Sequence, residues 1–314
     1  MTPTIAVTGA AGYIGSRLVP LLAPANVRAL VAKPVEYLPA AEQVEVDLTD
    51  PAAMLAACFE GVDAVIHLAG HNEVVATAEP DRALAETVLA SRHVAAAATA
   101  AGVRRIVYVS TVHVYGDALR PGATLTEADT PEPRSEYAIA RLASEHLLAE
   151  AAAETTELVV LRLTNAVGAP ADPDVDRWTL VATDLCHQAV HRHELRLRSS
   201  GRQWRDFVAL TDVCAALGRC ADPDGTVHPG TYNLASGQPR TVLELAELVR
   251  DRYEARRGVV LPLHTAPPEL DPAGPYTIDN RRLAAEGVRP TTPLAAAIDE
   301  LLDFIDDAPH GGTE

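Results

Sequence analysis

A chain of 314 residues, 48% of them hydrophobic, is long enough to bury a sizeable core and predicts one large domain or two fused domains. The formal net charge of -17 argues against nucleic acid or an anionic membrane as a partner. The cysteines (Cys58, Cys186, Cys214 and Cys220) show no CxxC spacing, so we expect buried, reduced thiols rather than a disulfide framework or a zinc site. The first apolar run begins almost at Met1 and no run is long enough to span a membrane, so we expect a cytoplasmic protein without a signal sequence.

The first apolar run, Ile5 to Val7, leads into the stretch Gly9-Ala10-Ala11-Gly12-Tyr13-Ile14-Gly15, where the first helical pattern begins. Gly9 permits a tight turn, Gly12 lets the backbone approach a pyrophosphate, and Gly15 lets the helix lie close to the strand. A glycine-rich turn alone can be a plain connection. Here a strand precedes it and a helix from Tyr13 to about Leu22 follows, which favours a dinucleotide-binding site.

Two further strands bring polar residues to the same edge of the expected sheet. The strand Val27 to Val31 is followed by Lys33, at about the position where an acid would bind the ribose of NAD and a base would accommodate the 2′-phosphate of NADP. Lys33 therefore favours NADP, and a solvated lysine at a strand end is an equal alternative. A third strand, Val44 to Leu48, places Asp47 where an adenine could be met.

Strands and helices then continue to alternate. We expect a helix over residues 51–59, a strand over residues 64–70, an Ala-rich helix over residues 80–101, and strands over residues 105–110 and 158–163. Near-continuous apolar strands suit a parallel sheet that is covered on both faces. The predicted fold is therefore α/β, with a Rossmann-type doubly wound sheet.

This pattern also predicts the domain organisation. We expect an NAD(P)-binding domain over residues 1–165 and a smaller, mostly substrate-binding lobe over residues 166–314. Strand segments around residues 204–213 and 231–236 could return to the first domain.

Candidate catalytic residues follow the fifth strand. The stretch from Ser110 to Asp117 puts hydroxyl groups, among them that of Thr111, at the carboxyl edge of the sheet, where ligands bind in such folds. Further along, Ser135 is a predicted cap of a helix that carries Tyr137 and Arg141. These two side chains are four residues apart and should share one face of that helix.

With these residues in place, the chain resembles the extended short-chain dehydrogenases/reductases, the family of UDP-glucose 4-epimerase-like nucleotide-sugar epimerases, dehydratases and reductases. The resemblance covers nearly the whole chain. The matching motifs are TGAAGYIG (8–15), VDL (46–48), HLAG (67–70), VSTVHVYGD (109–117), EYAIARLASE (136–145), LRLTNAVG (161–168), WRDFVALTDV (204–213) and YNLASG (232–237).

The resemblance implies the roles of several residues. Tyr137 corresponds to the tyrosine that exchanges a proton with a substrate hydroxyl during hydride transfer, and Thr111 to the residue that hydrogen-bonds the same oxygen. Because a phenol has an ordinary pKa of about 10, general-base work near neutrality requires a nearby cation. The remaining predicted coenzyme contacts come from the glycine motif and from the ends of the second, third and fourth strands: Gly9, Ala11, Gly12, Tyr13, Ile14, Lys33, Asp47, Leu48, Leu68, Ala69 and Gly70.

Arg141 stands where the family has the lysine that supplies this cation and holds the nicotinamide ribose. A guanidinium is always charged, but it is planar and larger than an ammonium, so its contacts must differ. Two alternatives remain open. Either the site tolerates arginine and the chain is an active enzyme, or it has lost hydride chemistry and is a nucleotide-binding regulatory or scaffold protein.

Other positions concern the substrate. By resemblance, Asn165 and Arg205 contact the diphosphate of a nucleotide sugar, although Arg205 could equally pair with Asp206. Val112 and His113 replace the Asp-Glu pair of the 4,6-dehydratases, which disfavours that activity, and His113 could line the substrate site.

The segment from residue 264 to residue 274 contains no arginine, whereas family members that bind a nucleoside diphosphate often have an Arg-x-Gly-Asp stretch there. This admits a polyol, a cyclitol or a keto compound as substrate. Thr87 stands near the place of a structural asparagine, a change that we expect to be tolerated.

His187, His191 and His193 lack a carboxylate or cysteine to complete a persuasive metal site, so no metal is expected. The Ala-rich helices containing residues 93–101 and 142–153 permit close packing, and the resemblance implies a homodimer formed through them. The expected activity is that of an NAD(P)-dependent epimerase or reductase. It would act on a secondary hydroxyl or ketone of a sugar-like, nucleotide-linked substrate.

Overall fold

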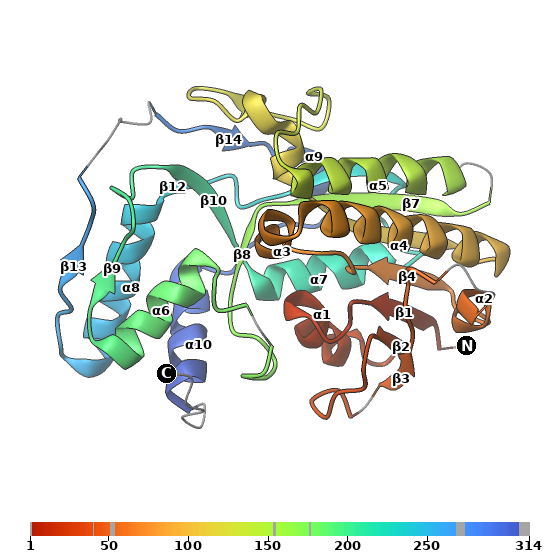
Figure 1. Ribbon diagram of the computed structural model, residues 1–314, viewed down its shortest axis with the longest axis horizontal. Helices are drawn as coiled ribbons and strands as arrows, with labels where there is room; N and C mark the ends of the chain where they lie inside the picture. Colours follow the sequence, from red (N-terminus) through yellow and green to blue (C-terminus); the bar gives the residue numbers. More distant parts are fainter. Residues whose placement is uncertain are drawn as a thin grey trace.

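A computed structural model describes residues 2–39, 41–50, 54–152, 155–175, 177–267 and 274–307. Its centre is a seven-stranded sheet in which every strand pairs in parallel, in the order β11-β7-β5-β4-β1-β2-β3 (Figure 1). In chain order its strands are β1 (Thr4–Thr8), β2 (Asn26–Val31), β3 (Glu42–Glu45), β4 (Ala64–His67), β5 (Arg105–Thr111), β7 (Glu157–Leu163) and β11 (Gly230–Leu234). The predicted α/β doubly wound fold is therefore confirmed.

Helices cover both faces of this sheet because its strands are apolar on both sides. On one face, Val7, Ile66 and Val107 pack in a core with residues of α1 (Tyr13–Leu18) and α7 (Leu210–Ala221). On the other face, alternate residues such as Val65 and Ile106 pack against α4 (Pro80–Ala100) and α5 (Glu136–Ala152). Small side chains let α4 and α5 lie side by side along the sheet, as Figure 1 shows.

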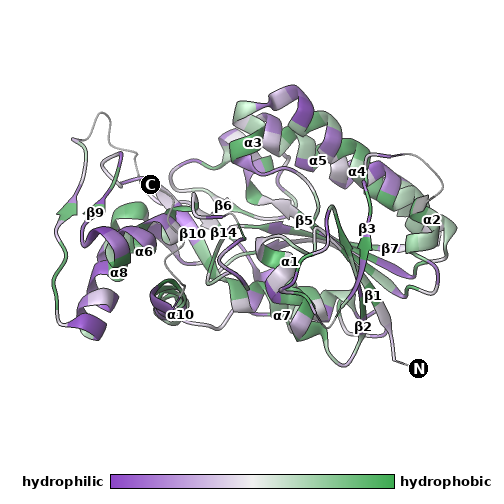
Figure 2. Cartoon of the chain, turned by 60° about the horizontal axis from the view of Figure 1, so that its bottom comes forward, coloured by the Kyte–Doolittle hydropathy of each residue, from purple (hydrophilic) through white to green (hydrophobic). Residues whose placement is uncertain are grey.

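A second lobe is built around a three-stranded sheet of β8 (Asn165–Val167), β10 (Trp204–Ala209) and β12 (Pro239–Thr241). It contains three further helices, α6 (Val181–Arg192), α8 (Val242–Arg257) and α10 (Leu294–Asp307), whose apolar faces form a core of their own (Figure 2). The chain passes between the lobes repeatedly, since α7 packs on the first sheet and β11 extends that sheet beyond β7.

The remaining elements are short. They are η1 (Val19–Leu22), α2 (Met54–Cys58), α3 (Glu73–Ala78), η2 (Val112–Ala118), β6 (Thr124–Leu125), β9 (Leu195–Arg196), β13 (Leu263–His264), β14 (Thr277–Ile278) and α9 (Arg281–Ala285). The pairs β6 with β14 and β9 with β13 form two-stranded parallel sheets.

Several predicted boundaries were wrong. The third strand ends at Glu45 rather than at Leu48, because the Asp47 carboxylate accepts hydrogen bonds from the Thr49 amide and hydroxyl (2.8 and 2.7 Å) and turns the chain. The fourth strand ends at His67, and Gly70 has a φ of 139°, which a strand does not permit.

Four other predicted segments need separate mention. The first helix continues beyond Leu18 only as the 3₁₀ turn η1, which contains Pro20. Residues 51–53 of the predicted helix 51–59, residue 153 of the predicted helix 142–153, and residues 268–273 of the stretch without arginine lie outside the described residues.

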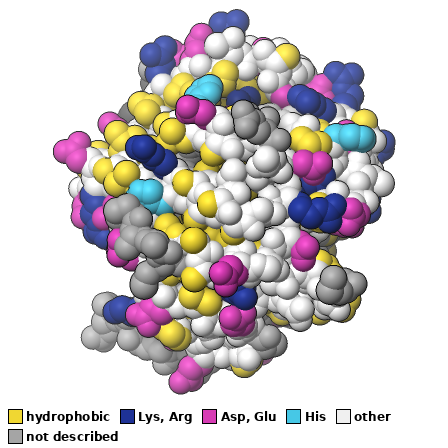
Figure 3. Space-filling model, turned by 90° about the vertical axis from the view of Figure 1, so that its right-hand side faces the viewer, with side chains coloured by type: hydrophobic (Ala, Val, Ile, Leu, Met, Phe, Trp, Pro, Cys, Tyr) yellow, Lys and Arg dark blue, Asp and Glu magenta, His cyan; other side chains and the backbone are white. Residues whose placement is uncertain are grey.

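All four cysteines are buried, as predicted, and no two of them are joined by a disulfide. No helix among the residues that the structure describes is long and apolar enough to cross a membrane. On the face shown in Figure 3, acidic and basic side chains are interspersed, so the excess of negative charge does not gather in one region of that face.

Candidate active site

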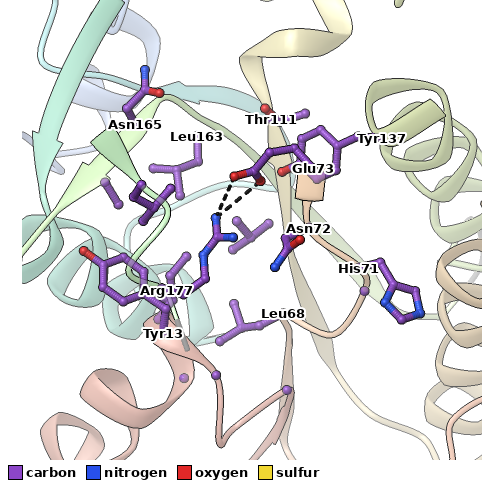
Figure 4. Close-up of a pocket in the computed structure, with 18 of the residues that line it drawn as sticks. Tyr13, Leu68, His71, Asn72, Glu73, Thr111, Tyr137, Leu163, Asn165 and Arg177 are labelled. Atoms are coloured by element: carbon purple, nitrogen blue, oxygen red, sulfur yellow. Dashed lines mark hydrogen bonds and ion pairs between the residues drawn. The ribbon is translucent and has the colours of Figure 1, made fainter. Parts of the chain in front are cut away.

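A cavity of about 640 Å³ opens at the carboxyl edge of the parallel strands and reaches into the second lobe. Such an edge is where ligands bind in open α/β sheets. Most predicted site residues line this cavity, and Figure 4 shows several of them. The predicted residues that line it are Gly9, Ala11, Gly12, Tyr13, Ile14, Leu68, Gly70, Thr111, His113, Tyr137, Arg141, Asn165 and Arg205.

The glycine motif forms one wall and leaves room for a ligand backbone. Gly9 has a φ of 66°, and a Cβ atom there would lie 2.9 Å from the Ala69 nitrogen, so only glycine fits. Gly12 precedes α1 and no side chain caps the helix at that position. The hydroxyl of Tyr13 donates to the Gly168 carbonyl (2.7 Å) and ties this wall to the second lobe. This cradle fits the pyrophosphate of a dinucleotide.

Thr111 and Tyr137 stand on the opposite wall. Thr111 ends β5, and its hydroxyl accepts a hydrogen bond from the His113 amide (3.2 Å). Tyr137 lies in the first turn of α5, where the Ser135 hydroxyl accepts from the Ala138 amide (3.3 Å) and acts as the predicted cap. The strand end and the helix start therefore bring the two hydroxyl groups to one cavity wall.

Arg141 lies one turn further along α5 and is buried, with its guanidinium carbon 5.4 Å from the centre of the Tyr137 ring. It donates to the carbonyls of Val109 and His71, both at 3.4 Å. A Cβ atom at Gly70 would come within 3.1 Å of the guanidinium, so the glycine makes room for the larger cation. The arginine therefore has contacts of its own to the main chain.

The electrostatics of Arg141 depend on two phenols. Burial disfavours its charge, but the Tyr108 and Tyr137 phenols outweigh this, and the pKa of the guanidinium lies above its ordinary value. Burial also raises the pKa of Tyr108. Neither Nε of Arg141 nor the Tyr108 hydroxyl has a hydrogen-bond partner among the described residues. The site thus holds a permanent positive charge beside Tyr137.

His71 and the nearby His67 are held by hydrogen bonds to buried hydroxyl groups. Thr87 accepts a hydrogen bond from the His71 amide (3.1 Å), so this threonine has a structural role of its own. His67, fully buried, bonds the hydroxyls of Thr8 (2.7 Å) and Ser91 (3.0 Å). Burial and the charge of Arg141 lower the pKa of His67 to about 3, so the ring is neutral.

Behind Tyr137, a buried ion pair fixes α5 to the sheet. Glu145 accepts from Arg162 of β7 in a bidentate arrangement (3.2 and 2.8 Å) and from the hydroxyl of Ser110. Both charged side chains are less than a tenth exposed. The sequence alone did not single out Glu145 for this role, because the pair spans two elements.

On the second-lobe side of the cavity, the Asn165 amide donates to the Asp206 carbonyl (2.8 Å), and Arg205 donates to the Trp204 carbonyl (2.7 Å). The Asp206 carboxylate instead accepts from Thr164 and Ser236. Burial and the charge of Arg205 lower the pKa of His113, whose ring lies 6.5 Å from that of Tyr137. His113 therefore faces the cavity as a neutral group near pH 7.

Among the cavity residues that sequence reasoning did not predict, three make contacts that join parts of the cavity wall. Glu73 begins α3 and forms an ion pair with Arg177, which follows β8 in the chain. Tyr37 follows β2 and donates to the Ala11 carbonyl (2.8 Å). No motif marks any of these positions, and each acquires its place from the tertiary fold.

Four predicted coenzyme contacts lie outside the cavity lining. Lys33 and Asp47 are exposed beyond the ends of β2 and β3. The main chain of Leu48 accepts a hydrogen bond from His93 (3.0 Å), and that of Ala69 donates to Thr8 (3.2 Å). Contact of these four residues with a coenzyme stays a prediction.

The histidine-rich segment offers no metal centre in the described ranges. His187 and His191 have ring centres 4.3 Å apart, and His187 packs near Trp178 (5.8 Å). No group of three or more His, Cys, Asp or Glu side chains there could hold a metal ion.

A parallel sheet with a glycine-rich first turn, and with a threonine, a tyrosine and a buried cation at its carboxyl edge, defines a Rossmann-type nucleotide-binding protein. The model of the NAD dependent epimerase/dehydratase family matches residues 5–235. The chain belongs to this family, and the resemblance to the extended short-chain dehydrogenases/reductases is confirmed.

Named relatives act on nucleotide-linked sugars. The chain is 29% identical to a GDP-6-deoxy-D-mannose reductase of Pseudomonas aeruginosa, with 92% of this chain and 90% of the relative covered. It is 34% identical to a dTDP-6-deoxy-L-talose 4-dehydrogenase (NAD(P)(+)) of Kitasatospora kifunensis, with 87% and 85% covered. The solved structure of MoeE5 in complex with UDP-glucose and NAD is 25% identical and has a TM-score of 0.81 over 96% of this chain and 98% of that one. The relatives do not favour the alternative of a scaffold protein.

Proposed function

We propose that this protein is an NAD(P)-dependent oxidoreductase or epimerase that acts at a secondary hydroxyl or ketone of a nucleotide-linked sugar. The observation that carries the proposal is that Thr111, Tyr137 and the buried Arg141 share one cavity with the glycine motif. The named relatives, a reductase and a dehydrogenase of nucleotide-linked sugars, support the same class of substrate.

In this proposal the side chains of the cavity handle the proton. The Thr111 hydroxyl donates a hydrogen bond to the substrate oxygen, and Tyr137 removes or returns the proton at that oxygen. The Arg141 guanidinium, whose carbon lies 5.4 Å from the centre of the Tyr137 ring, places a positive charge beside this step. The bound nicotinamide supplies a hydride acceptor or donor, and Gly9, Gly12 and Arg141 would hold the dinucleotide.

Asn165 and Arg205 are proposed to bind the substrate on the second-lobe side of the cavity. Val112 and His113 offer no carboxylate pair, so 4,6-dehydration stays disfavoured in this proposal. Dehydratases of other kinds belong to the same fold, since an NDP-hexosamine 5,6-dehydratase is a structural neighbour at 24% identity and a TM-score of 0.80.

Three accompanying proposals complete this assignment. NADP is the proposed coenzyme because Lys33 is available at the end of β2, although it lies outside the cavity lining. A homodimer through α4 and α5 is proposed because Leu89 and Ile139, one on each helix, are exposed. A cytoplasmic location is proposed on the sequence alone.

The test is the near-ultraviolet absorbance of reduced nicotinamide. The purified protein is mixed with NAD or NADP and with pooled nucleotide sugars and simple polyols, and in the reverse direction with NADH or NADPH and keto-sugars. Turnover that disappears in Tyr137→Phe supports the proposal. Lasting reduction indicates a dehydrogenase, and transient reduction indicates an epimerase. Nucleotide binding without any hydride transfer in either direction would refute the proposal and favour a binding protein.

A further inference from the structure

Glu73 and Arg177 meet inside the cavity, although 104 positions separate them in the chain. Nη2 of Arg177 lies 3.3 Å from each carboxylate oxygen of Glu73. Figure 4 shows the guanidinium directed toward Glu73, with Tyr13 and Leu68 nearby on the glycine-motif side. The ion pair therefore lies between the coenzyme wall and the wall that carries Thr111 and Tyr137.

The main chain of Arg177 is hydrogen-bonded through both its amide and its carbonyl. Its amide donates to the Val175 carbonyl (2.9 Å), and its carbonyl accepts from the Thr183 hydroxyl at the start of α6 (2.8 Å). The side chain is 18% exposed and lines the cavity. These contacts hold the base of the side chain and leave the guanidinium to face the cavity space.

The guanidinium has unused donors. Nη1 of Arg177 is buried and has no hydrogen-bond partner among the described residues. Glu73 satisfies only Nη2, at the long distance of 3.3 Å for an ion pair. A buried charged donor without an acceptor is unfavourable, so an anion that offers two oxygens would satisfy the group better.

The other two arginines that line the cavity donate to main-chain carbonyls, whereas the partner of Arg177 is a carboxylate. Arg141 is bound to two main-chain carbonyls beside Tyr137. Arg205 is bound to the carbonyl of its neighbour Trp204. The charge of Arg177 acts on the phenol of Tyr13, opposing the burial that raises the pKa of that group, so the guanidinium lies close to the glycine motif.

We propose that Arg177 is a phosphate-binding residue of this cavity, and that its guanidinium leaves Glu73 to bind two oxygens of a diphosphate. A planar fork suits such bidentate binding. Both the dinucleotide coenzyme and a nucleotide-linked sugar contain this group. Binding of the sugar-linked diphosphate rests on the proposed function, whereas binding of the coenzyme diphosphate requires only that the cavity binds a dinucleotide. Glu73 neutralises the arginine in the empty cavity and opposes an incoming anion.

This exchange predicts opposite effects of the two partners. Arg177→Gln should weaken diphosphate binding by about 10- to 100-fold, because it removes a charge-assisted bidentate contact. Glu73→Gln should strengthen it by about 2- to 5-fold, because it removes a competing anion that is half exposed. In the Arg177→Gln background, Glu73→Gln should change the affinity little, because there is no arginine to release.

The experiment is calorimetric titration of the full chain with NADH, NADPH, UDP, GDP and dTDP, each alone. Arg104→Gln is the matched control, because Arg104 forms an exposed ion pair with Asp224 outside the cavity. A loss confined to NADH or NADPH assigns the coenzyme diphosphate, and a loss confined to the nucleoside diphosphates assigns the substrate diphosphate.

If Arg177→Gln binds these ligands as tightly as the wild type, the inference about Arg177 is wrong. The proposed function is not affected by that result, because hydride transfer by the wild-type protein is measured separately. A wild-type protein that binds none of these ligands overturns both the inference and the proposed function. Should Arg177→Gln fail to fold, Glu73→Gln still decides, because a variant that binds diphosphates no more tightly than the wild type contradicts the exchange.

Discussion

Replacing Arg141 by lysine tests whether the cavity is adapted to its unusual cation. The guanidinium reaches the Val109 and His71 carbonyls with separate nitrogens, each at 3.4 Å. The ammonium of a lysine would lie at about the position of the guanidinium carbon, so it is too short to reach both carbonyls. Arg141→Lys therefore keeps the charge but loses its anchors on both sides of the cavity wall.

The magnitude follows from these two bonds. Each is long, so we assign it about 0.5–1.5 kcal/mol, which gives a loss of about 1–3 kcal/mol in the free energy of unfolding. A charge that is no longer fixed beside Tyr137 should also slow hydride transfer. A comparable loss of transition-state stabilisation corresponds to about 5- to 150-fold in kcat/KM.

Two assays measure the effects, urea unfolding for stability and absorbance of reduced nicotinamide for activity. Arg92→Lys is the matched control, because Arg92 is exposed on α4 and its replacement should change neither quantity. Arg141→Met removes the charge and should be less active than Arg141→Lys. A lysine variant as stable as the wild type and more active would refute this reasoning, since it would show that arginine impairs the site.

Two other predictions concern stability. His67 is buried with its pKa lowered to about 3, so between the ordinary His pKa near 6.5 and that value only the unfolded chain gains the proton, and stability falls as the pH falls. His67→Gln removes this pH dependence. We expect the free energy of unfolding of the variant, relative to that of the wild type, to be about 2 kcal/mol more favourable at about pH 5 than at about pH 7, as measured by urea unfolding. An equal difference at both pH values would contradict the buried neutral ring. Glu145→Gln leaves the Arg162 charge buried and unpaired and should cost about 3–5 kcal/mol, whereas Asp224→Asn, in an exposed pair with Arg104, should cost less than about 1 kcal/mol. Similar losses in the free energy of unfolding of Glu145→Gln and Asp224→Asn would contradict the larger contribution expected of the buried pair.

The sequence predicted the parts of the site that depend on local patterns. The glycine motif between a strand and a helix, and the spacing of Tyr137 and Arg141 on one helical face, need only neighbouring residues to be recognised. The resemblance added Thr111, Asn165 and Arg205, all of which line the cavity.

The rest depends on contacts between distant segments. Glu73 and Arg177 belong to no recognisable sequence motif. Their ion pair joins α3 to a segment of the second lobe, so it could not be predicted from neighbouring residues. The interpretation of Asp47 as the end of a strand failed because a short side-chain turn with Thr49 competes with strand pairing. Lys33 and Asp47 are exposed and lie outside the cavity lining, so their contact with a coenzyme stays a prediction.

The repeated passage of the chain between the lobes limits how this protein can diversify. β11 completes the first sheet, but it follows β8, α6 and β10 of the second lobe in the chain. Neither lobe is therefore formed by one continuous stretch of residues. Exchange of a whole lobe by recombination would require several simultaneous breakpoints in buried strands. We therefore expect new substrate specificity to be most accessible through single substitutions at positions that border the cavity, such as Glu73 at the start of α3 and Arg177.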